Sequence, residues 1–496
     1  MASQEEIRAV RLQKLALLRE KGLNPYPIST KRDATLAEAV SQFDELAKKP
    51  AVSVAGRVMS LRPQGALVFI TLNDGTGKFQ GLIKKAAEVA EAGTVSAEVF
   101  DLFGQTVDIG DFIELAGGLF VTKRGEKTVA VASLRMLSKS LRPLPEKWHG
   151  LQDIDERFRH RYLDTLMDES VRARFVARAK IVSEIRRSLD AAGYLEVETP
   201  ALQPLAGGTN ATPFVTHHKA LDTDLFLRIA PELYLKKLLV GGFPKVYEIG
   251  RNFRNEGIDT THNPEFTMLE YYEAYSDASQ QMVFAESLLR NVVEKACGSL
   301  SVVFDEETID FAKPFARMSY ADLLGKYAGI AHPETLTLEQ ARAKAAECKV
   351  KVDPKDPLEK IIDNIYKKAC RPKIVQPTFI VDYPVAFLPL AKRSEENPAL
   401  VNAFQLVAGG MELVKAFSEL NDPIDQKSRF MDQEKNAKAG DDEAQPNDEE
   451  YLEAMEYGMP PAGGVGVGID RLTMLLTGMK NIKEVILFPT LKPKGE

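Results

Sequence analysis

Short stretches of alternating hydrophobic and polar residues fill much of the first third of the chain. They span residues 52–59, 67–72, 78–83, 112–122 and 127–137, and turn residues such as the run Asn-Asp-Gly-Thr-Gly at 73–77 separate them. A period of two is typical of strands with one buried face. A helical stretch near residues 98–104 interrupts the series between the third strand and the fourth. The pattern therefore predicts five strands with one inserted helix.

Five short strands in this arrangement favour a small closed barrel of the oligonucleotide-binding type, the OB-fold. Such barrels bind single-stranded bases by stacking and by hydrogen bonds to base edges. Three residues on or beside the first three strands are candidates for these contacts. They offer a cation, an aromatic ring and an amide, and they are Arg62, Phe69 and Gln80. A phenylalanine in an alternating strand is more often a core residue, so both interpretations of Phe69 stay open.

Helical periodicity precedes the barrel. Residues 4–21 form an amphipathic pattern that stops at Gly22 and a following Asn-Pro-Tyr-Pro run. We expect its buried side to consist of Ile7, Leu12, Leu15 and Leu18. After the barrel, Pro143, Pro145 and the Trp148-His149-Gly150 segment mark a linker, so a domain boundary is predicted near residue 150.

From Arg157 onward, long helical patterns alternate with strands that suggest antiparallel pairing. Residues 170–192 predict a helix that ends at Gly193, and a strand at 194–200 closes on a proline. Residues 246–275 predict a hairpin with a long connection. Four side chains on this hairpin suit a triphosphate nucleotide, since Arg forks onto phosphate and a ring stacks on a purine: Arg254, Glu256, His262 and Phe266. The alternative is an exposed loop whose Arg and Glu pair with each other.

Near the C-terminus, residues 463–472 predict a glycine-dense strand that enters a helix. The segment lacks the GxGxxG spacing and the P-loop lysine of the common phosphate-binding loops. Glycines here would let the backbone approach a ligand closely, with Arg471 at the helix start directed at phosphate.

Composition narrows the function classes. The chain has 496 residues and three widely spaced cysteines, which form neither a disulfide framework nor a zinc cluster. No hydrophobic run is long enough for a membrane span, and the N-terminus is unlike a secretory signal, so we expect a cytoplasmic protein. The net charge is −7, but residues 1–150 carry +4, from 21 Lys and Arg against 17 Asp and Glu. This asymmetry is modest, and it is the direction expected if the first third binds a polyanion.

Three segments together resemble a known family. They are the helix and strand that end at Pro200, the Phe253-Arg254-Asn255-Glu256 loop and the Gly468-Ile469-Asp470-Arg471 ending, and they resemble, in order, the three signatures of class II aminoacyl-tRNA synthetases. The chain is most similar to the bacterial-type lysyl-tRNA synthetases, and further matching segments lie at 216–218, 230–236, 253–257, 262–270, 417–422 and 458–461. The likeness runs from about residue 50 to Pro489.

The resemblance implies an α+β multidomain fold. Residues 1–50 would be an N-terminal helical extension, 51–145 an OB-fold anticodon-binding domain, and 146–496 a class II catalytic domain whose antiparallel sheet is flanked by helices. A helical insertion is expected at about 331–377. The implied reaction activates L-lysine with ATP and Mg²⁺ to lysyl-adenylate and transfers lysine to the 3′ end of tRNA(Lys). A homodimer is expected, with the first signature at its interface.

The resemblance also implies residue roles. Arg254 and Arg471 would be catalytic. ATP would contact Arg254, Glu256, His262, Phe266, Glu412 and Arg471. Lysine would contact Gly208, Glu232, Arg254, Glu270, Tyr272, Phe417 and Glu419. Magnesium would bind Glu412 and Glu419. On a regular strand these two glutamates, seven residues apart, would point to opposite faces unless a bulge intervenes.

Two positions depart from the family pattern. Lys415-Ala416 stands where the family usually has Asn-Gly or Asn-Ala, and Leu388 stands where it usually has serine. A lysine at 415 could neutralise a carboxylate, but it adds positive charge beside a cationic substrate. The resemblance therefore gives Lys415 no role.

Three other functions remain open at this point. A ligase that attaches lysine to a protein shares the catalytic domain but characteristically lacks the N-terminal barrel, so residues 50–140 count against it. A non-catalytic RNA-binding paralogue would be expected to lose the ATP residues, which are present here. Aspartyl or asparaginyl relatives would need a cation where this chain offers Glu270 and Glu419.

Overall fold

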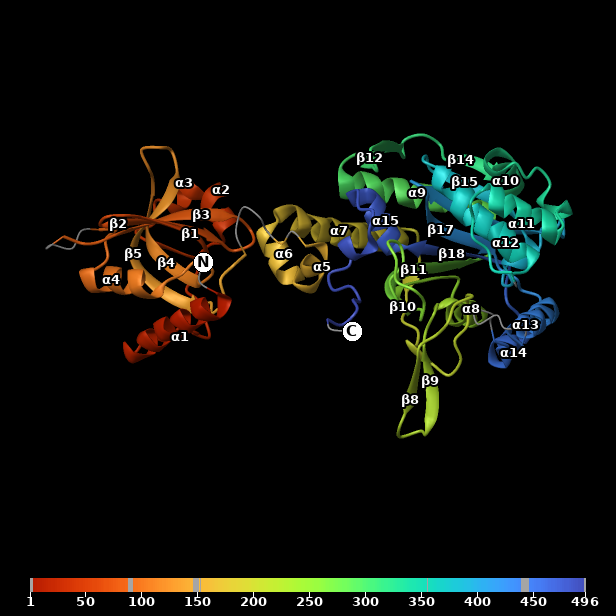
Figure 1. Ribbon diagram of the computed structural model, residues 1–496, viewed down its shortest axis with the longest axis horizontal. Helices are drawn as coiled ribbons and strands as arrows, with labels where there is room; N and C mark the ends of the chain where they lie inside the picture. The colour runs from red at the N-terminus through yellow and green to blue at the C-terminus, as the bar shows by residue number, and fades with distance from the viewer. Residues whose placement is uncertain are drawn as a thin grey trace. The chain divides into compact units, whose positions relative to one another are not determined.

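The computed structural model describes residues 3–87, 92–145, 151, 153–354, 356–438 and 446–494. The chain divides into two compact units, Met1–Gly150 and Leu151–Glu496, and each is considered by itself below (Figure 1). The predicted linker segment Trp148-His149-Gly150, and with it the expected boundary between residues 145 and 146, lies outside the described residues.

The first unit is a closed five-stranded barrel with the strand order β1-β2-β3-β5-β4, so the predicted barrel is confirmed. Its strands are β1 (Val52–Gln64), β2 (Leu67–Asn73), β3 (Lys78–Lys84), β4 (Phe112–Val121) and β5 (Lys127–Ser138). Its helices are α1 (Gln4–Glu20), α2 (Leu36–Ser41), α3 (Phe43–Leu46) and α4 (Ala97–Thr106), and α4 is the predicted insertion between the third strand and the fourth. The inward residues of alternating strands, such as Ile70 and Val129, fill the barrel with no exposed surface.

Helix α1 has the predicted bounds within one residue, but one part of its predicted buried side is wrong. Leu15 and Leu18 are buried, whereas Leu12 is 37% exposed. Arg11 is buried in its place, and its guanidinium donates to the carbonyl of Ile109 at 2.9 Å and to Ser140 Oγ at 3.0 Å. Polar anchoring to the barrel therefore sets the rotation of the helix, and hydrophobic periodicity alone could not predict it.

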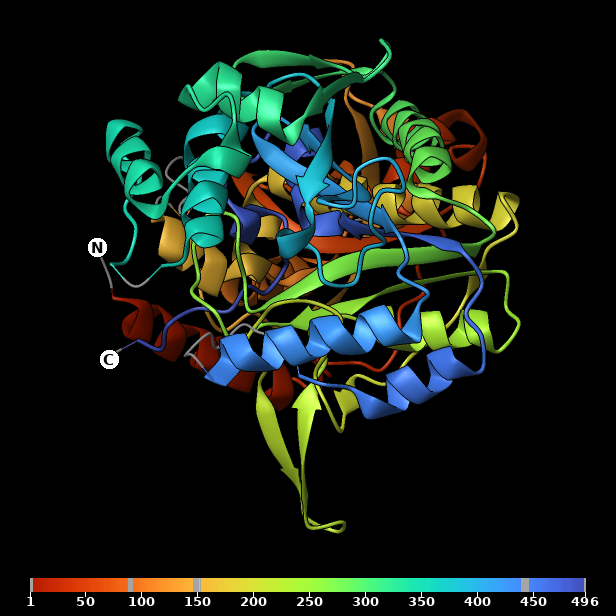
Figure 2. The ribbon, with the colours of Figure 1, turned by 90° about the vertical axis from the view of Figure 1, so that its right-hand side faces the viewer.

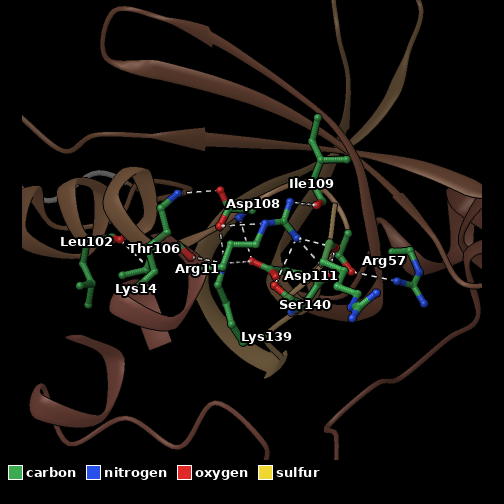
Figure 3. A network of polar contacts seen from close by, with 12 residues as sticks. Arg11, Lys14, Arg57, Leu102, Thr106, Asp108, Ile109, Asp111, Lys139 and Ser140 are labelled. Atoms are coloured by element: carbon green, nitrogen blue, oxygen red, sulfur yellow. Dashed lines mark hydrogen bonds and ion pairs between the residues drawn. The ribbon is translucent and has the colours of Figure 1, made fainter. Parts of the chain in front are cut away.

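Arg11 belongs to a buried polar network that joins α1 to the end of β5 (Figure 3). Lys139 has no exposed side-chain surface and pairs with Asp111 at 2.8 Å and with Asp108 at 2.5 Å. Lys14 pairs with the other oxygen of Asp108 at 2.6 Å. Burial would raise the pKa of Asp108, but the hydrogen bonds from Lys139 and Lys14 hold it below its usual value. Asp108 therefore stays ionised at neutral pH.

The second unit is built on an eight-stranded sheet in the order β14-β15-β16-β17-β18-β11-β10-β6. Its members are β6 (Leu195–Glu196), β10 (Lys245–Phe253), β11 (Glu265–Ala274), β14 (Ala316–Ser319), β15 (Thr378–Pro384), β16 (Leu400–Ala408), β17 (Met411–Ser418) and β18 (Ala462–Gly468). The central pairs are antiparallel, while β14–β15 and β6–β10, at the two edges, are parallel. The predicted hairpin is the β10–β11 pair.

Helices α7 (Glu169–Ala191), α9 (Ala278–Cys297) and α15 (Ile469–Thr477) cover one face of this sheet. Residues such as Ile185, Leu289 and Leu475 pack there against Leu269 and Val467 of the sheet. The α+β class predicted from the sequence, a barrel followed by a largely antiparallel sheet with flanking helices, is confirmed. Most of the candidate site residues carried by the sheet project from the opposite face.

That opposite face is partly covered at both ends. Helix α8 (Glu232–Val240) packs on β10 and β11, next to α13 (Pro423–Lys438) and α14 (Glu449–Glu456) (Figure 2). At the β15–β16 end lies a helical group, within and just before the expected insertion: α10 (Tyr320–Ala328), η1 (Pro333–Thr335), α11 (Leu338–Glu347), α12 (Leu358–Ile365), the π-helical turn η2 (Tyr366–Cys370) and η3 (Arg371–Lys373).

The remaining elements lie around this framework. They are α5 (Ile154–Arg159), α6 (Arg161–Met167), β7 (Leu202–Gln203), β8 (Val215–His218), β9 (Thr223–Leu227), β12 (Ser301–Phe304), β13 (Glu307–Asp310), η4 (Val385–Phe387) and η5 (Ile482–Glu484). The β8–β9 hairpin extends away from the body of the second unit (Figure 2). None of the described helices is both long enough and apolar enough to span a membrane.

The buried network predicts a stability effect confined to the barrel. Lys139→Met leaves Asp108 and Asp111 without their buried cation, and breaking such a pair costs about 3–5 kcal/mol. Hydrogen exchange of the full chain, followed by mass spectrometry, should show faster exchange in β4 and β5. Lys123→Met, at an exposed turn position, is the matched control. Equal protection in the two variants would contradict the role assigned to the network.

Candidate active site and nucleic-acid-binding surface

The strand β18 presents three glycines to the face of the sheet that carries the candidate site. Gly464, Gly466 and Gly468 alternate along β18 with Val465 and Val467, which belong to the core on the other face. Gly466 stands opposite Lys415 of β17 and Glu270 of β11. Directly opposed residues project to the same side of a sheet, so these flanking side chains rise on either side of a glycine floor.

Gly464 shows how closely the site is packed over this floor. It stands opposite Phe417 and Tyr272, and a methyl group at its Cα would lie 2.0 Å from Glu419 Oε1 and 2.4 Å from Tyr272 Cε1. At Gly466 a methyl group would meet nothing closer than 3.8 Å. The sequence predicted a glycine-dense strand here. At Gly464 the glycine is a steric requirement, because Glu419 and Tyr272 lie directly over the backbone.

One end of the floor is acidic. Glu232, Glu270 and Glu419 are all buried there, and the single cation among them is the buried Lys236. Lys236 Nζ lies 2.5 Å from Glu232 Oε1 and 2.5 Å from Glu419 Oε2, while Tyr272 donates to Glu270 at 3.0 Å. If all three acids ionised, the cluster would carry a net charge of −2. A buried surplus of this size calls for a cationic ligand.

The pKa values of Glu270, Glu419 and Lys236 reflect this excess of acidic groups. Burial, followed by the neighbouring Glu232, raises the pKa of Glu270 to about 8. Burial also raises the pKa of Glu419 well above its usual value, although Lys236 opposes this shift. For Lys236, burial would lower the pKa, but Glu232 and Glu419 hold it above its usual value. Without a ligand, the cluster therefore keeps its lysine charged and favours protonated carboxyl groups.

Two further predicted residues adjoin the acidic end. Gly208 has φ = +94°, and a methyl group at its Cα would lie 3.0 Å from Glu232 Cβ, so its backbone passes directly over that glutamate. The ring of Phe417 lies 5.4 Å from Lys236 Nζ. The structure thus brings together all the residues beyond Arg254 that the resemblance assigns to lysine, although they come from distant parts of the sequence.

The other end of the floor is basic. Arg254 follows β10 and lies 4.9 Å above the ring of Phe266, and no described carboxylate comes within 4 Å of its guanidinium. The alternative of an Arg254–Glu256 ion pair is therefore wrong. Burial lowers the pKa of Arg254, with Glu256 the foremost group acting against it. Glu256 itself is exposed on the connection between the two strands.

Arg471 lies in the first turn of α15, beside the long connection. Its Nη2 donates to His262 Nε2 at 3.0 Å, and His262 Nδ1 lies 2.9 Å from Asp259. Because an arginine can only donate, Nε2 is the accepting nitrogen, and the neutral ring donates from Nδ1 to Asp259. Asp259 was missed in the sequence, where nothing distinguishes it from a surface acid. It fixes the ring that the resemblance directs at phosphate.

A bulge places Glu412 on the functional face. The pairing of β17 with β16 shifts between Val414 and Glu412, so Leu413 is the extra residue and both Leu413 and Val414 face the core. Glu412 and Glu419 consequently project to the same side, as the metal expectation required. They lie in different surroundings, however, because Glu419 is in the acidic cluster and Glu412 is beside Arg371, at 3.9 Å. No group of three or more His, Cys, Asp and Glu side chains in the described ranges is arranged to hold a metal.

The barrel of the first unit carries the three predicted base contacts together. Arg62 stands opposite Phe69 across β1 and β2, its guanidinium 6.0 Å from the ring, and donates to Gln80 Oε1 at 2.9 Å. In β2 the buried residues are Val68, Ile70 and Leu72, so Phe69 faces outward and is half-buried. The interpretation of Phe69 as a core residue is therefore wrong.

Each of the two units matches a known protein family. Residues 153–492 match the family model described as tRNA synthetases class II (D, K and N), and residues 52–137 match an OB-fold nucleic acid binding domain. A lysine--tRNA ligase of Pelotomaculum thermopropionicum is 48% identical over 99% of this chain and 95% of its own length. Lysine--tRNA ligases of Moorella thermoacetica and Roseiflexus sp. are each 47% identical, over 100% of both chains and 99% of both chains respectively.

The glycine floor predicts a sharp difference between two neighbouring alanine substitutions. Gly464→Ala forces the Tyr272 ring away, and overpacking of this kind costs about 1–3 kcal/mol. Gly466→Ala adds the same methyl group in ordinary van der Waals contact. Thermal unfolding of the two variants should show a lower Tm for Gly464→Ala only. An equal loss in both would mean that strand flexibility, and not the pocket walls, requires glycine.

Proposed function

The chain belongs to the class II tRNA synthetases of the D, K and N group, and we propose that it is the lysine-specific member, a ligase that joins lysine to tRNA(Lys) with ATP. The observation that carries this proposal is the buried cluster of Glu232, Glu270 and Glu419 around a single Lys236. A substrate with two ammonium groups supplies the positive charge that the cluster lacks. Aspartate and asparagine cannot, because their side chains bring a negative charge or none.

The cluster divides into two subsites for the substrate. We assign the α-ammonium group to Glu232 and the Gly208 backbone, and the ε-ammonium group to Glu270, Tyr272 and Glu419. Phe417 lies beside Lys236 and lines the aliphatic part of the substrate. A substrate that lacks the far charge would leave the buried Glu270 without a cation, which penalises neutral side chains of similar length.

The activation step needs positioning and positive charge. An oxygen of the lysine carboxylate attacks the α-phosphorus of ATP, the bond to the bridging oxygen breaks, and pyrophosphate leaves with that electron pair. The nucleophile is already ionised, so no general base is required. Arg254 binds the carboxylate and the α-phosphate, and Arg471 and His262 bind the outer phosphates, which stabilises charge as it shifts toward pyrophosphate.

Adenine recognition falls to the β10–β11 hairpin. Arg254 lies over the Phe266 ring, and this ring stacks on the purine with one of its faces. Glu256 accepts a hydrogen bond from the adenine amino group. In the second step the 3′-terminal hydroxyl of tRNA(Lys) attacks the carbonyl carbon of the adenylate and AMP leaves. Arg62, Phe69 and Gln80 of the barrel bind anticodon bases, which ties transfer to one tRNA.

In this proposal, magnesium binds as part of the Mg–ATP complex. A bound Mg²⁺ neutralises phosphate charge and is typically held by one or two carboxylates together with substrate oxygens. Glu412 fits such a role because burial would raise its pKa, but Arg371 and Arg471 hold it below its usual value and so keep it ionised. Glu419 would be the second carboxylate, although Lys236 already contacts it at 2.5 Å.

We further propose a homodimer that works in the cytoplasm. The first-signature elements α7 and β6 expose hydrophobic side chains, Val176 at 52% and Leu195 at 50%, which suits a face covered by a second copy. The three cysteines, Cys297, Cys348 and Cys370, are free thiols, as expected in a reducing compartment.

Pyrophosphate exchange tests the assignment of substrate. With ATP, magnesium and labelled pyrophosphate, L-lysine should support exchange, while aspartate, asparagine and arginine should not. Arginine is the sharpest comparison, since it carries the same charge on a larger planar group. Exchange with aspartate at the rate found for lysine would overturn the lysine assignment.

The barrel contacts predict a defect in transfer alone. Phe69→Leu keeps much of the apolar volume but removes the stacking ring, which is worth about 1–3 kcal/mol per base. Pyrophosphate exchange should be unchanged, while the KM for tRNA(Lys) should rise about 5- to 150-fold. Phe112→Leu is the matched control, because this half-buried ring also lies under an arginine, Arg57 at 4.2 Å, on another part of the barrel. Normal charging by Phe69→Leu, or an equal defect in the control, would contradict the proposed base contact.

A further inference from the structure

Four cations surround the Glu412 carboxylate at the basic end of the site. In order of their influence on its pKa, they are Arg371, Arg471, Lys415 and Lys367. Arg471 donates through Nη1 to the Glu412 carbonyl at 3.5 Å, and Lys367 pairs with Asp363 at 2.6 Å. The other two, Arg371 and Lys415, have no role in the function proposed above.

Arg371 reaches the site from the helical group. It begins η3, directly after the π-helical turn η2, and such turns are frequent at functional sites. Its Nη1 lies 3.9 Å from Glu412 Oε2, its side chain is 21% exposed, and its Nε is buried without a hydrogen-bond partner. Tyr366 of the same turn donates to Gln405, which stands opposite Lys415 across β16 and β17. Helical turn and sheet therefore meet at this point.

Lys415 carries an ammonium group without a partner. It lies on the functional face between Glu412 and Phe417, and within the described ranges it makes no hydrogen bond and no ion pair. Burial lowers the pKa of Lys415, and Glu412 is the largest influence in the other direction. Arg371 and Lys415 thus each keep a donor without a partner among the described residues, and a single carboxylate 3.9 Å from Arg371 does not satisfy both.

The position of the pair indicates which anion would bind. Arg371, Glu412, Arg471 and His262 follow one another at 3.9, 3.5 and 3.0 Å, so Arg371 continues the line of groups directed at the outer phosphates. Lys415 lies beside this line, on the same face of β17 as Glu412. Glu419 and Tyr272 of the acidic cluster lie over Gly464, while Glu270 flanks Gly466 on the side opposite Lys415. The two carboxylates repel an anion on their side of the floor. A polyphosphate chain is the anion of the reaction that has several charges spread over this length.

We propose that Arg371 and Lys415 bind the phosphates of ATP directly, as two further nucleotide-binding residues. The inference rests on the proposed function for the identity of the nucleotide. The two side chains place positive charge next to Glu412, where the proposed function also expects Mg²⁺ to bind. ATP should consequently bind this protein measurably in the absence of free divalent cations.

Calorimetric titration of the full chain in EDTA tests the proposal, with ATP and with adenosine as separate ligands. Arg371→Gln and Lys415→Gln should each raise the Kd for ATP about tenfold, the loss of one charge-assisted contact. Neither should change the Kd for adenosine, which has no phosphate. Lys368→Gln is the matched control, because Lys368 is an exposed lysine in the same helical turn, and it should bind both ligands like the unmodified chain.

Two results would overturn the inference. ATP affinity equal to that of the unmodified chain in both variants would show that the cations do not reach phosphate. Equal losses for ATP and adenosine would assign them a structural role. Failure of the proposed function looks different, because it would appear in the unmodified chain as an absence of lysine-dependent pyrophosphate exchange when ATP and magnesium are supplied.

Discussion

The second unit depends on one constraint: three carboxylates are buried around one lysine, above a strand that presents glycines to them. The glycines of β18 create the space, and Gly464 in particular allows Glu419 and Tyr272 to approach each other. Desolvation makes the arrangement costly. A carboxyl group with a folded pKa near 8, as for Glu270, lowers the stability of the ligand-free protein as pH rises above its usual value of 4.5. A bound cation reverses that cost.

Charge is separated along the same floor. Acids gather where β11 and β17 meet α8, and cations gather where the β10–β11 connection, α15 and the helical group converge. Under the proposed function, an amino acid with an anionic end and a cationic far end, next to a polyphosphate, matches this separation. The two ends would then fix the orientation of both substrates.

Periodicity and turn residues were sufficient to predict the barrel strands, the β10–β11 hairpin and the strand that leads into α15. They failed at Leu12 and Arg11, because long-range hydrogen bonds to Ile109 and Ser140 decide which side of α1 is buried. The position of Glu412 depended on a bulge at Leu413, which local sequence does not reveal. Arg371 and Asp259 joined the site only through tertiary contacts, so no sequence motif marked them.

The proton balance of lysine binding tests the central claim most directly. Titration calorimetry at pH 7, in buffers with different ionisation enthalpies, counts the protons exchanged when lysine binds. If the buried acids with raised pKa values are protonated in the ligand-free protein, the binding of cationic lysine ionises them, and protons should be released. Glu270→Gln should release fewer, because burial and Glu232 raise the pKa of Glu270 to about 8. Binding of lysine with no proton release, or with proton uptake, would contradict the account.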